Sequence, residues 1–426
     1  MIKADNAPTS AALRVPAPGP RPPTPRYAAM QGRIIAAAVA EINAQGVRGM
    51  SIAGVAQRLG LGPTGIIYYF KSKEDLAAAA LLKAIEHHDG LIAASEAAPP
   101  GDARVQAFIC GYFACRRRIA DGTQEDVAYF NDVRALNRSD VNAAYLAMYR
   151  RGRRLVASAH DHGTDCATTA ARNCRAVLLH AQVFWVLGWL HRWEPQDYDR
   201  VGRRMADLVT GGLLPDHAPL PATPWPHLPA FAPAAVQAGD DDPAADAFLR
   251  AATQLINEEG YHGASIERIA GRLNLTKGAF YHRNATKDDL VVACFQRSFT
   301  IMWGAIRAAE NGGGSGAQVL IALVSALVTL QISGTPLLRT SAFSSVPETI
   351  RWGMLIKLNR ITLRFSSILS DGIADGSLRP VDVAIAAELV MAAVNAASEL
   401  PFWTPGITQQ TAVTHYVQPL FMGMRR

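Results

Sequence analysis

The chain has 426 residues, 49% of them hydrophobic, and a formal net charge of +6 at pH 7. This length is sufficient for two or three domains. The five cysteines are odd in number and lack paired C-x-x-C spacing, so we expect reduced thiols in a cytoplasmic protein, with no metal site and no cofactor. The longest apolar stretches that we identify, residues 176–190 and 319–332, are shorter than the roughly 18 residues of a membrane-spanning helix, so we expect no membrane segment.

The N-terminal segment, residues 1–28, is rich in proline and has no apolar signal-peptide core. This composition predicts a disordered arm rather than a targeting signal. Arg21 and Arg26 could contact DNA, although a solvated tail is the favoured interpretation.

Residues 29–90 are expected to form a first helical head. Apolar residues recur at helical spacing over 34–42, and residues 43–49 supply a stop and a turn. Ser51 is expected to cap a second helix that ends at Gly60, and Pro63 to open a third helix over 63–70. This order predicts a helix-turn-helix, whose second helix lies in the major groove of DNA.

Residues 91–213 have amphipathic helical patterns without strand alternation, which predicts a first helical body for ligand binding and dimerisation. Its two aromatic stripes are expected to be core rather than pocket, and its arginine clusters, 116–118 and 150–154, to be solvated helix faces. The stripes consist of Val105, Phe108, Ile109, Tyr112 and Phe113, and of Val141, Ala144, Tyr145, Met148 and Tyr149. No histidine pair has companions at metal-ligand spacing, so no histidine is assigned as a metal ligand. The sequence does not identify a ligand pocket.

A proline-rich linker, residues 214–243, separates the two halves. At about 3.1 Å per residue such a segment can span some 90 Å, which exceeds the roughly 34–36 Å between the recognition helices of a dimer. The two halves can therefore pack as an intramolecular pseudo-dimer.

The second head, residues 244–300, contains a repeat of the first. Residues 249–290 match residues 35–76 without a gap, 214 positions apart, and the shared residues include Asn43/Asn257 and Gly46/Gly260. Matches at apolar positions and turn glycines indicate a duplicated structural unit. Asp242 is expected to cap its first helix, with Pro243 at the first helical position and Ser265 as the cap of its second. Residues 301–426 are expected to form a second helical body.

The basic charge is unevenly divided between the heads. Residues 21–83 contain eight basic and three acidic residues, whereas residues 244–297 contain seven and six. If neutralisation of phosphates sets affinity, the first head should be the stronger DNA anchor.

Residues 60–76 read GLGPTGIIYYFKSKEDL and residues 274–290 read NLTKGAFYHRNATKDDL. Both resemble the end of the DNA-binding head in the TetR family of bacterial repressors, G-[VL]-[ST]-x-G-x-[LI]-Y-x-[HY]-F-x-x-K-[ED]-x-L. The resemblance implies an all-α chain of two tandem TetR-like units, each with a helix-turn-helix head and a helical ligand-binding and dimerisation body.

The resemblance also implies roles for individual residues. In the family, a recognition-helix tyrosine and the lysine that opens helix four bind phosphates, and a small polar residue that opens helix three faces DNA. The candidate DNA-binding residues are Ser51, Thr64, Tyr68, Tyr69 and Lys73 in the first head, and Ser265, Thr276, Lys277, Tyr281, His282 and Lys287 in the second.

Both heads depart from the family pattern. The first has Ile67 where the phosphate-binding tyrosine is expected. The second has Arg283 in place of His or Tyr, and Asn284 in place of the Phe that packs beneath the recognition helix. Because burial of a Phe side chain contributes about 1.5–3 kcal/mol, we expect the second head to be less rigid.

The sequence therefore predicts a ligand-responsive DNA-binding transcriptional regulator, with repression as the expected effect. Its partners would be double-stranded operator DNA and an apolar small-molecule effector, and a further homodimer stays open. The alternative is a small-molecule sensor or protein-interaction module with degenerate heads that do not bind DNA. An enzyme is disfavoured because no nucleophile elbow, paired-carboxylate motif or metal motif is visible.

Overall fold

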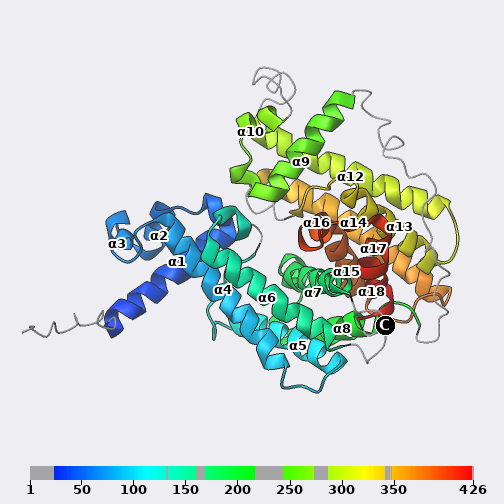
Figure 1. Cartoon of the computed structure of the whole chain (residues 1–426), viewed down its shortest axis with the longest axis horizontal. Coiled ribbons are helices and arrows are strands. Elements are labelled where there is room, and N and C mark those ends of the chain that lie inside the picture. Colours follow the sequence, from blue (N-terminus) through cyan, green and yellow to red (C-terminus); the bar gives the residue numbers. More distant parts are fainter. Residues whose placement is uncertain are drawn as a thin grey trace, which may run out of the picture.

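The structure is a computed structural model that describes residues 24–130, 133–159, 168–215, 243–272, 286–340, 346 and 348–424. Within these ranges every regular element is helical, which confirms the all-α prediction. Figure 1 shows two helical heads that project from a common helical body.

The first half begins with three head helices, followed by four helices of 19 to 23 residues and by a last helix of 14 residues. They are α1 (Pro25–Gly49), α2 (Ile52–Leu59), α3 (Pro63–Ile67), α4 (Lys73–Ser95), α5 (Asp102–Ala120), η1 (Val133–Leu136), α6 (Ser139–Ala157), α7 (Thr169–Trp189), η2 (Leu190–Arg192), η3 (Pro195–Asp197) and α8 (Tyr198–Gly211).

The described elements of the second half follow the same order, and its final helix is divided by a π-helical turn. Its elements are α9 (Pro243–Gly263), α10 (Ile266–Arg272), α12 (Lys287–Asn311), α13 (Gly316–Ile332), α14 (Glu348–Ala374), α15 (Val383–Ala396), η6 (Ala397–Glu399), α16 (Leu400–Trp403), α17 (Gln409–Ala412), η7 (Val413–Val417) and α18 (Gln418–Met422).

Helix α1 begins inside the segment expected to be a disordered arm. The Thr24 hydroxyl accepts a hydrogen bond from the Tyr27 backbone N–H at 3.3 Å, and Pro25 occupies the first helical turn. A capping side chain and a proline whose missing N–H needs no partner both favour a start at this point. The expected boundary at residue 28 is therefore too late.

The local turn rules hold in both heads. Gly46 and Gly260 both have φ 73°, with ψ 169° and 168°, so the repeat extends to the backbone conformation. The hydroxyls of Ser51 and Ser265 accept N–H groups three residues on, at 3.0 and 3.3 Å, as predicted for N-caps. Gly60 ends α2 in the left-handed conformation, φ 65°.

The third helix is shorter than predicted. It ends at Ile67 rather than at residue 70, and the following residues form a turn, with the Tyr68 N–H donating to Thr64 O and the Phe70 N–H to Ile66 O. Ile66 and Phe70 are both buried beneath this turn.

Two long helices cross the expected boundaries between head and body. Helix α4 runs through residue 90, and α12 runs through residue 300, without interruption. Each head is thus joined to its body by a continuous helix. Because such a helix is rigid, a movement of the body end can displace the head.

The halves contact each other through their last helices. Helix α7 packs against α15 and η7, and α8 packs against α15. These elements lie at the centre of the molecule in Figure 1, with the first body on one side and the second on the other. They belong to residues 91–213 and 301–426, the two segments expected to form ligand-binding and dimerisation bodies.

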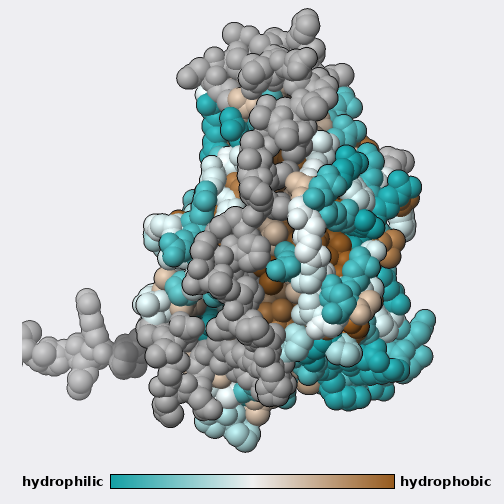
Figure 2. Space-filling model, turned by 90° about the vertical axis from the view of Figure 1, so that its right-hand side faces the viewer, coloured by the Kyte–Doolittle hydropathy of each residue, from teal (hydrophilic) through white to brown (hydrophobic). Residues whose placement is uncertain are grey.

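Among the described residues, one continuous helical stretch, Val383–Trp403, which comprises α15, η6 and α16, has the length and apolar composition needed to cross a membrane, and 67% of its most apolar part is buried inside the protein. A buried core helix of a soluble protein meets the same criteria. The apolar stretches identified in the sequence did not include it. On the face in Figure 2 the described surface is mostly hydrophilic, and apolar side chains gather near its middle.

Candidate functional site

The recognition helix of the first head presents both polar and apolar side chains to solvent. Thr64 is exposed, Tyr68 is 73% exposed, and Ile67, at the position of the expected tyrosine, is 50% exposed. The ring centroids of Tyr68 and Tyr69 lie 5.1 Å apart, and Tyr27 from the start of α1 lies 4.7 Å from Tyr69. The start of α1 therefore supports the tyrosines instead of belonging to a free arm.

Lys73 occupies the first turn of α4, where the family pattern places a phosphate-binding lysine. Its Nζ donates to the backbone carbonyl of Arg48 at 2.6 Å. This bond joins the end of α1 to the beginning of α4. The hydroxyl of Ser51 is engaged in its helix cap, although the residue is exposed.

The second head differs at the equivalent position. Lys287 is half-buried, and its Nζ lies 4.3 Å from the ring centroid of Tyr261. Burial lowers the pKa of Lys287, whereas burial and a hydrogen bond to Asp288 raise the pKa of Tyr261. Ser265 caps α10. The other candidates, Thr276, Lys277, Tyr281 and His282, lie outside the described residues.

Arginines of the second head form ion pairs with its acidic residues. Arg272 lies 2.6 Å from Glu258, Arg268 pairs with Glu259, and Arg297 lies 2.7 Å from Asp246. In the first head Arg58 pairs with Glu41 at 2.8 Å. Neutralised arginines attract phosphate less strongly, which is consistent with a weaker DNA anchor in the second head.

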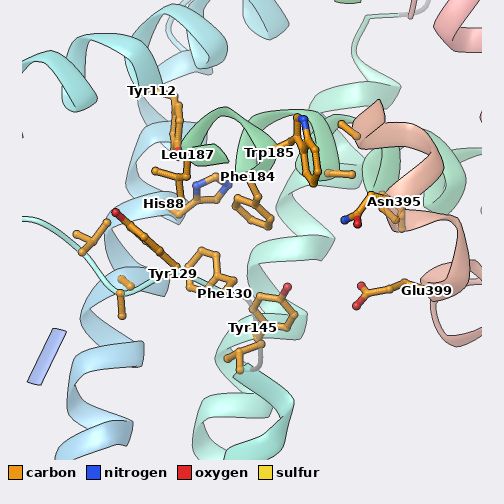
Figure 3. A pocket seen from close by; sticks show the side chains of 18 of the residues that line it. His88, Tyr112, Tyr129, Phe130, Tyr145, Phe184, Trp185, Leu187, Asn395 and Glu399 are labelled. Atoms are coloured by element: carbon orange, nitrogen blue, oxygen red, sulfur yellow. The ribbon is translucent and has the colours of Figure 1, made fainter. Parts of the chain in front are cut away.

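A pocket lies between the two halves (Figure 3). The first half supplies rings from α4, α5, α6 and α7 and from the loop at residues 124–130, and the second half supplies polar side chains from α9, α15, η6 and the segment before α14. The rings are His87, His88, Tyr112, Tyr129, Phe130, Tyr145, Tyr149, Phe184 and Trp185, and the polar groups of the second half are Asn257, Glu258, Arg339, Thr340, Asn395 and Glu399.

The pocket corrects two expectations from the sequence. Tyr112, Tyr145 and Tyr149 belong to the stripes expected to be core alone, yet all three also line the pocket. Arg116, expected on a solvated face, has a side chain only 12% exposed and lies 2.8 Å from Asp126. Helical spacing identifies buried positions, but it does not distinguish a filled core from a lined cavity.

Two buried histidines lie side by side next to the pocket, and one of them, His88, also lines it. His88 Nε2 and His180 Nδ1 lie 3.4 Å apart, and both rings are almost fully buried. Burial lowers the pKa of His180 to about 3 and that of His88 well below its usual value of 6.5. Both rings are therefore neutral at pH 7. Gly152 leaves the space that His180 occupies, because a Cβ there would overlap its Nε2.

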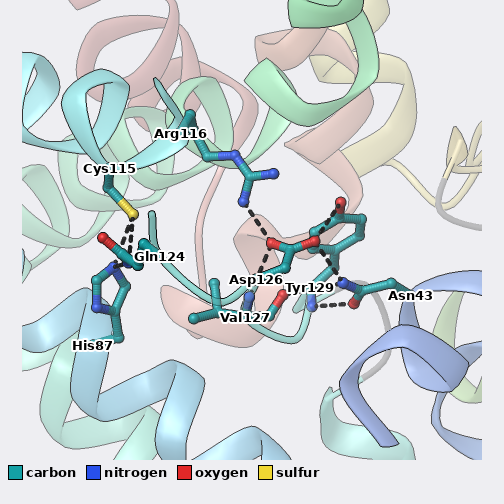
Figure 4. A network of polar contacts seen from close by, with 8 residues as sticks. All are labelled: Asn43, His87, Cys115, Arg116, Gln124, Asp126, Val127 and Tyr129. Atoms are coloured by element: carbon teal, nitrogen blue, oxygen red, sulfur yellow. Dashed lines mark hydrogen bonds and ion pairs between the residues drawn. The ribbon is translucent and has the colours of Figure 1, made fainter. Parts of the chain in front are cut away.

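The first pocket loop, residues 124–130, joins the pocket to the first head (Figure 4). Asn43 of α1 donates through Nδ2 to the Val127 carbonyl at 3.1 Å, and its Oδ1 accepts the Tyr129 N–H at 2.9 Å. At the other end of the loop, the Gln124 amide donates to Cys115 Sγ at 3.2 Å, and His87 Nε2 lies 3.0 Å from the same sulfur.

The second pocket loop, residues 335–340, repeats this bridge. Asn257 of α9 donates through Nδ2 to the Leu337 carbonyl at 2.9 Å, and its Oδ1 accepts the Arg339 N–H at 2.9 Å. The sequence did not assign these bridges, although Asn43 and Asn257 are among the residues that the repeat shares. The available signal was an asparagine repeated at the same position of the first helix in both heads.

Among the described residues, no group of three or more His, Cys, Asp or Glu side chains is arranged to hold a metal ion. Four cysteines, Cys110, Cys115, Cys174 and Cys294, are free thiols. Burial raises the pKa of each of them.

Comparison with known proteins identifies the heads. The family model described as bacterial regulatory proteins, tetR family, matches residues 34–80 and again residues 248–294. The Transposon Tn10 TetC protein of Escherichia coli is 29% identical over 137 residues, which cover 32% of this chain and 68% of that protein.

Several solved structures are also similar to part of the chain. The TetR family regulator PfmR of Thermus thermophilus is 21% identical, with 42% of this chain and 99% of that one covered and a TM-score of 0.35. A tetR-family regulatory protein of Rhodococcus RHA1 is 22% identical, with 43% and 98% covered and a TM-score of 0.36. The two matches to the family model, one in each half, show that the chain belongs to the TetR family of DNA-binding regulators and contains two of its units in tandem.

Proposed function

We propose that this chain is a ligand-responsive transcriptional repressor whose two heads bind operator DNA as an intramolecular pseudo-dimer. The packing of α7 and α8 against α15 and η7 supports this proposal most directly, because the terminal helices of one half meet those of the other within one chain. A chain that pairs its own two units can offer two heads to one DNA site.

For the division into domains we keep the sequence expectation with two adjustments, one at the start of α1 and one at the start of the linker. The heads would comprise residues 29–90 and 244–300 and the bodies residues 91–213 and 301–426, with α1 extended back to Pro25. The linker would begin after Leu214, since the N–H groups of Leu213 and Leu214 donate to the Phe421 carbonyl at 2.8 and 2.9 Å.

The effector would be a mostly apolar small molecule bound in the aromatic pocket. A ligand can shift the regulator between two states only if it binds them with different affinity. The pocket is suited to this requirement because it is lined by both halves, so a change in their packing changes the pocket.

A second candidate function is a sensor whose heads do not bind DNA. The half-buried Lys287, the paired arginines of the second head and the exposed Ile67 favour it. The two functions differ in one property, which is salt-dependent affinity for DNA.

Fluorescence anisotropy tests the proposal. The full chain is titrated into a labelled duplex from upstream of its own coding sequence, and into a scrambled duplex of equal length, at several salt concentrations. We expect tighter binding to the upstream duplex and an affinity that falls steeply with salt. Equal affinity for both duplexes, or no binding to either, would contradict DNA regulation and favour the sensor.

A further inference from the structure

We propose that the pocket between the halves is a single effector site that binds one neutral, aromatic ligand with a polar end, and that both heads respond to it through Asn43 and Asn257. This inference rests on the proposed ligand-responsive function and specifies its ligand class, its stoichiometry and its route to the heads.

The chemistry of the ligand follows from the division of the lining. The first half contributes aromatic rings, which favour a planar apolar ligand through stacked and edge contacts. The second half contributes Asn395 and Glu399 at the opposite side of the pocket, as Figure 3 shows. A ligand that spans both sides therefore needs an apolar ring system and a polar group at one end.

The charges of the lining are compensated within the protein. Arg116 lies 2.8 Å from Asp126, Arg339 pairs with Glu399, and Glu258 lies 2.6 Å from Arg272. His88 is neutral because burial lowers its pKa. A charged ligand would lose hydration without an uncompensated partner among these groups, so the pocket favours a neutral one.

The route to the heads is the same in both halves. In each pocket loop the head asparagine donates to one carbonyl and accepts the N–H two residues further on: Val127 and Tyr129 in the first loop, Leu337 and Arg339 in the second. These paired hydrogen bonds hold each loop against the first helix of its head, a few residues before the turn glycine Gly46 or Gly260.

Both loops line the same pocket. The first contributes Val127 to Phe130, and the second contributes Arg339 and Thr340. The Asn395 amide oxygen also accepts the Thr340 N–H at 3.0 Å, so the polar end of a ligand would lie beside the second loop. One ligand molecule can therefore contact the supports of both heads at once, which is not possible for two separate pockets, one in each body.

Binding of a neutral fluorescent amine, N-phenyl-1-naphthylamine, tests the shared site without DNA. We expect one molecule per chain. Ala181→Leu from the first half and Ala396→Leu from the second should each weaken binding at least tenfold, because both residues line the pocket. Ala384→Leu, at an exposed position of α15, is the control and should bind like the parent.

Two molecules per chain, no binding of the amine, or parent-like affinity in Ala396→Leu would overturn the shared site. Failure of the proposed function would appear elsewhere, as a lack of salt-dependent DNA binding in a chain that still binds one amine.

Amide hydrogen exchange tests the route. With the amine bound, we expect slower exchange at residues 43–50 and 257–264. Asn43→Ala should abolish the change in the first head and leave the second, and Asn257→Ala should do the reverse, each measured with the amine at saturation. Asn173→Ala is the control: it removes a side-chain hydrogen bond to the Trp403 carbonyl that does not involve a head, and it should preserve both changes. Retention of both changes in Asn43→Ala and Asn257→Ala would overturn the route.

Discussion

Gly212 and Gly423 lie against each other at the ends of α8 and α18, and neither position has room for a side chain. Their φ angles are 72° and 83°, and a Cβ on Gly212 would overlap the Gly423 backbone, while a Cβ on Gly423 would overlap that of Thr210. Two backbone hydrogen bonds join the same two segments. The Leu213 N–H donates to the Phe421 carbonyl at 2.8 Å, and the Met424 N–H donates to the Val209 carbonyl at 3.1 Å.

Gly212→Ala should therefore destabilise the packing of the halves. The left-handed backbone and the overlap together are expected to lower the free energy of unfolding by about 3 kcal/mol or more. Gly122→Ala is the matched control, because Gly122 has φ 71° but nothing within 4 Å of an added Cβ. If urea unfolding shows the same loss of unfolding free energy for both variants, the close approach of the Gly212 and Gly423 backbones contributes nothing to stability.

A buried carboxylate links α7 to α15. Glu388 is 3% exposed, and it accepts the Trp185 indole N–H at 2.8 Å and an Arg192 N–H at 2.6 Å. Arg192→Ala leaves the carboxylate buried without its cationic partner, so we expect a loss of about 1–3 kcal/mol in unfolding free energy. Glu388→Gln, which removes the charge, should cost less. A greater loss for Glu388→Gln would contradict this order.

The histidine pair predicts a pH dependence of stability. In the unfolded chain each ring binds a proton near pH 6.5, whereas folded His180 does so only near pH 3 and the pKa of folded His88 is also lowered. The unfolded state thus binds more protons as the pH falls below about 6.5, and the unfolding free energy should decrease by about 1.4 kcal/mol per pH unit for each ring.

Urea unfolding between pH 7 and pH 4 measures this dependence. His88→Gln and His180→Gln should each reduce the slope by one proton, since glutamine does not titrate. If the unfolding free energy of the parent and of the double variant falls with pH at the same slope, other groups cause the acid sensitivity.

The heads are expected to contribute unequally to DNA affinity. Lys73→Ala should weaken binding to all sequences and lower the salt slope by about one. Lys287→Ala should have less effect, because its ammonium already lies over the Tyr261 ring. Thermal unfolding of both variants is needed as a control, since Lys73 also bonds to the Arg48 carbonyl. Greater damage by Lys287→Ala at equal stability would contradict the charge argument.

The parts of the fold that depend on neighbours in sequence were predictable. Ser51, Gly60 and Ser265 occupy the cap positions that local rules assign to them. The end of α3 was not predictable from local rules, because no glycine or proline follows Ile67 to mark it. The pocket was not predictable either, since His88 and Glu399, more than three hundred positions apart in the chain, line one pocket only through packing of the two halves.

The central claim, that one chain supplies both heads of a DNA-bound pseudo-dimer, is tested most directly by native mass spectrometry. The full chain is mixed with a duplex selected from a random pool. Thr64 and Tyr68 in one head, and Thr276 and Lys277 in the other, differ as hydrogen-bond donors, so the account predicts one chain per duplex and two unlike half-sites. Two chains per duplex on a palindromic consensus would contradict it.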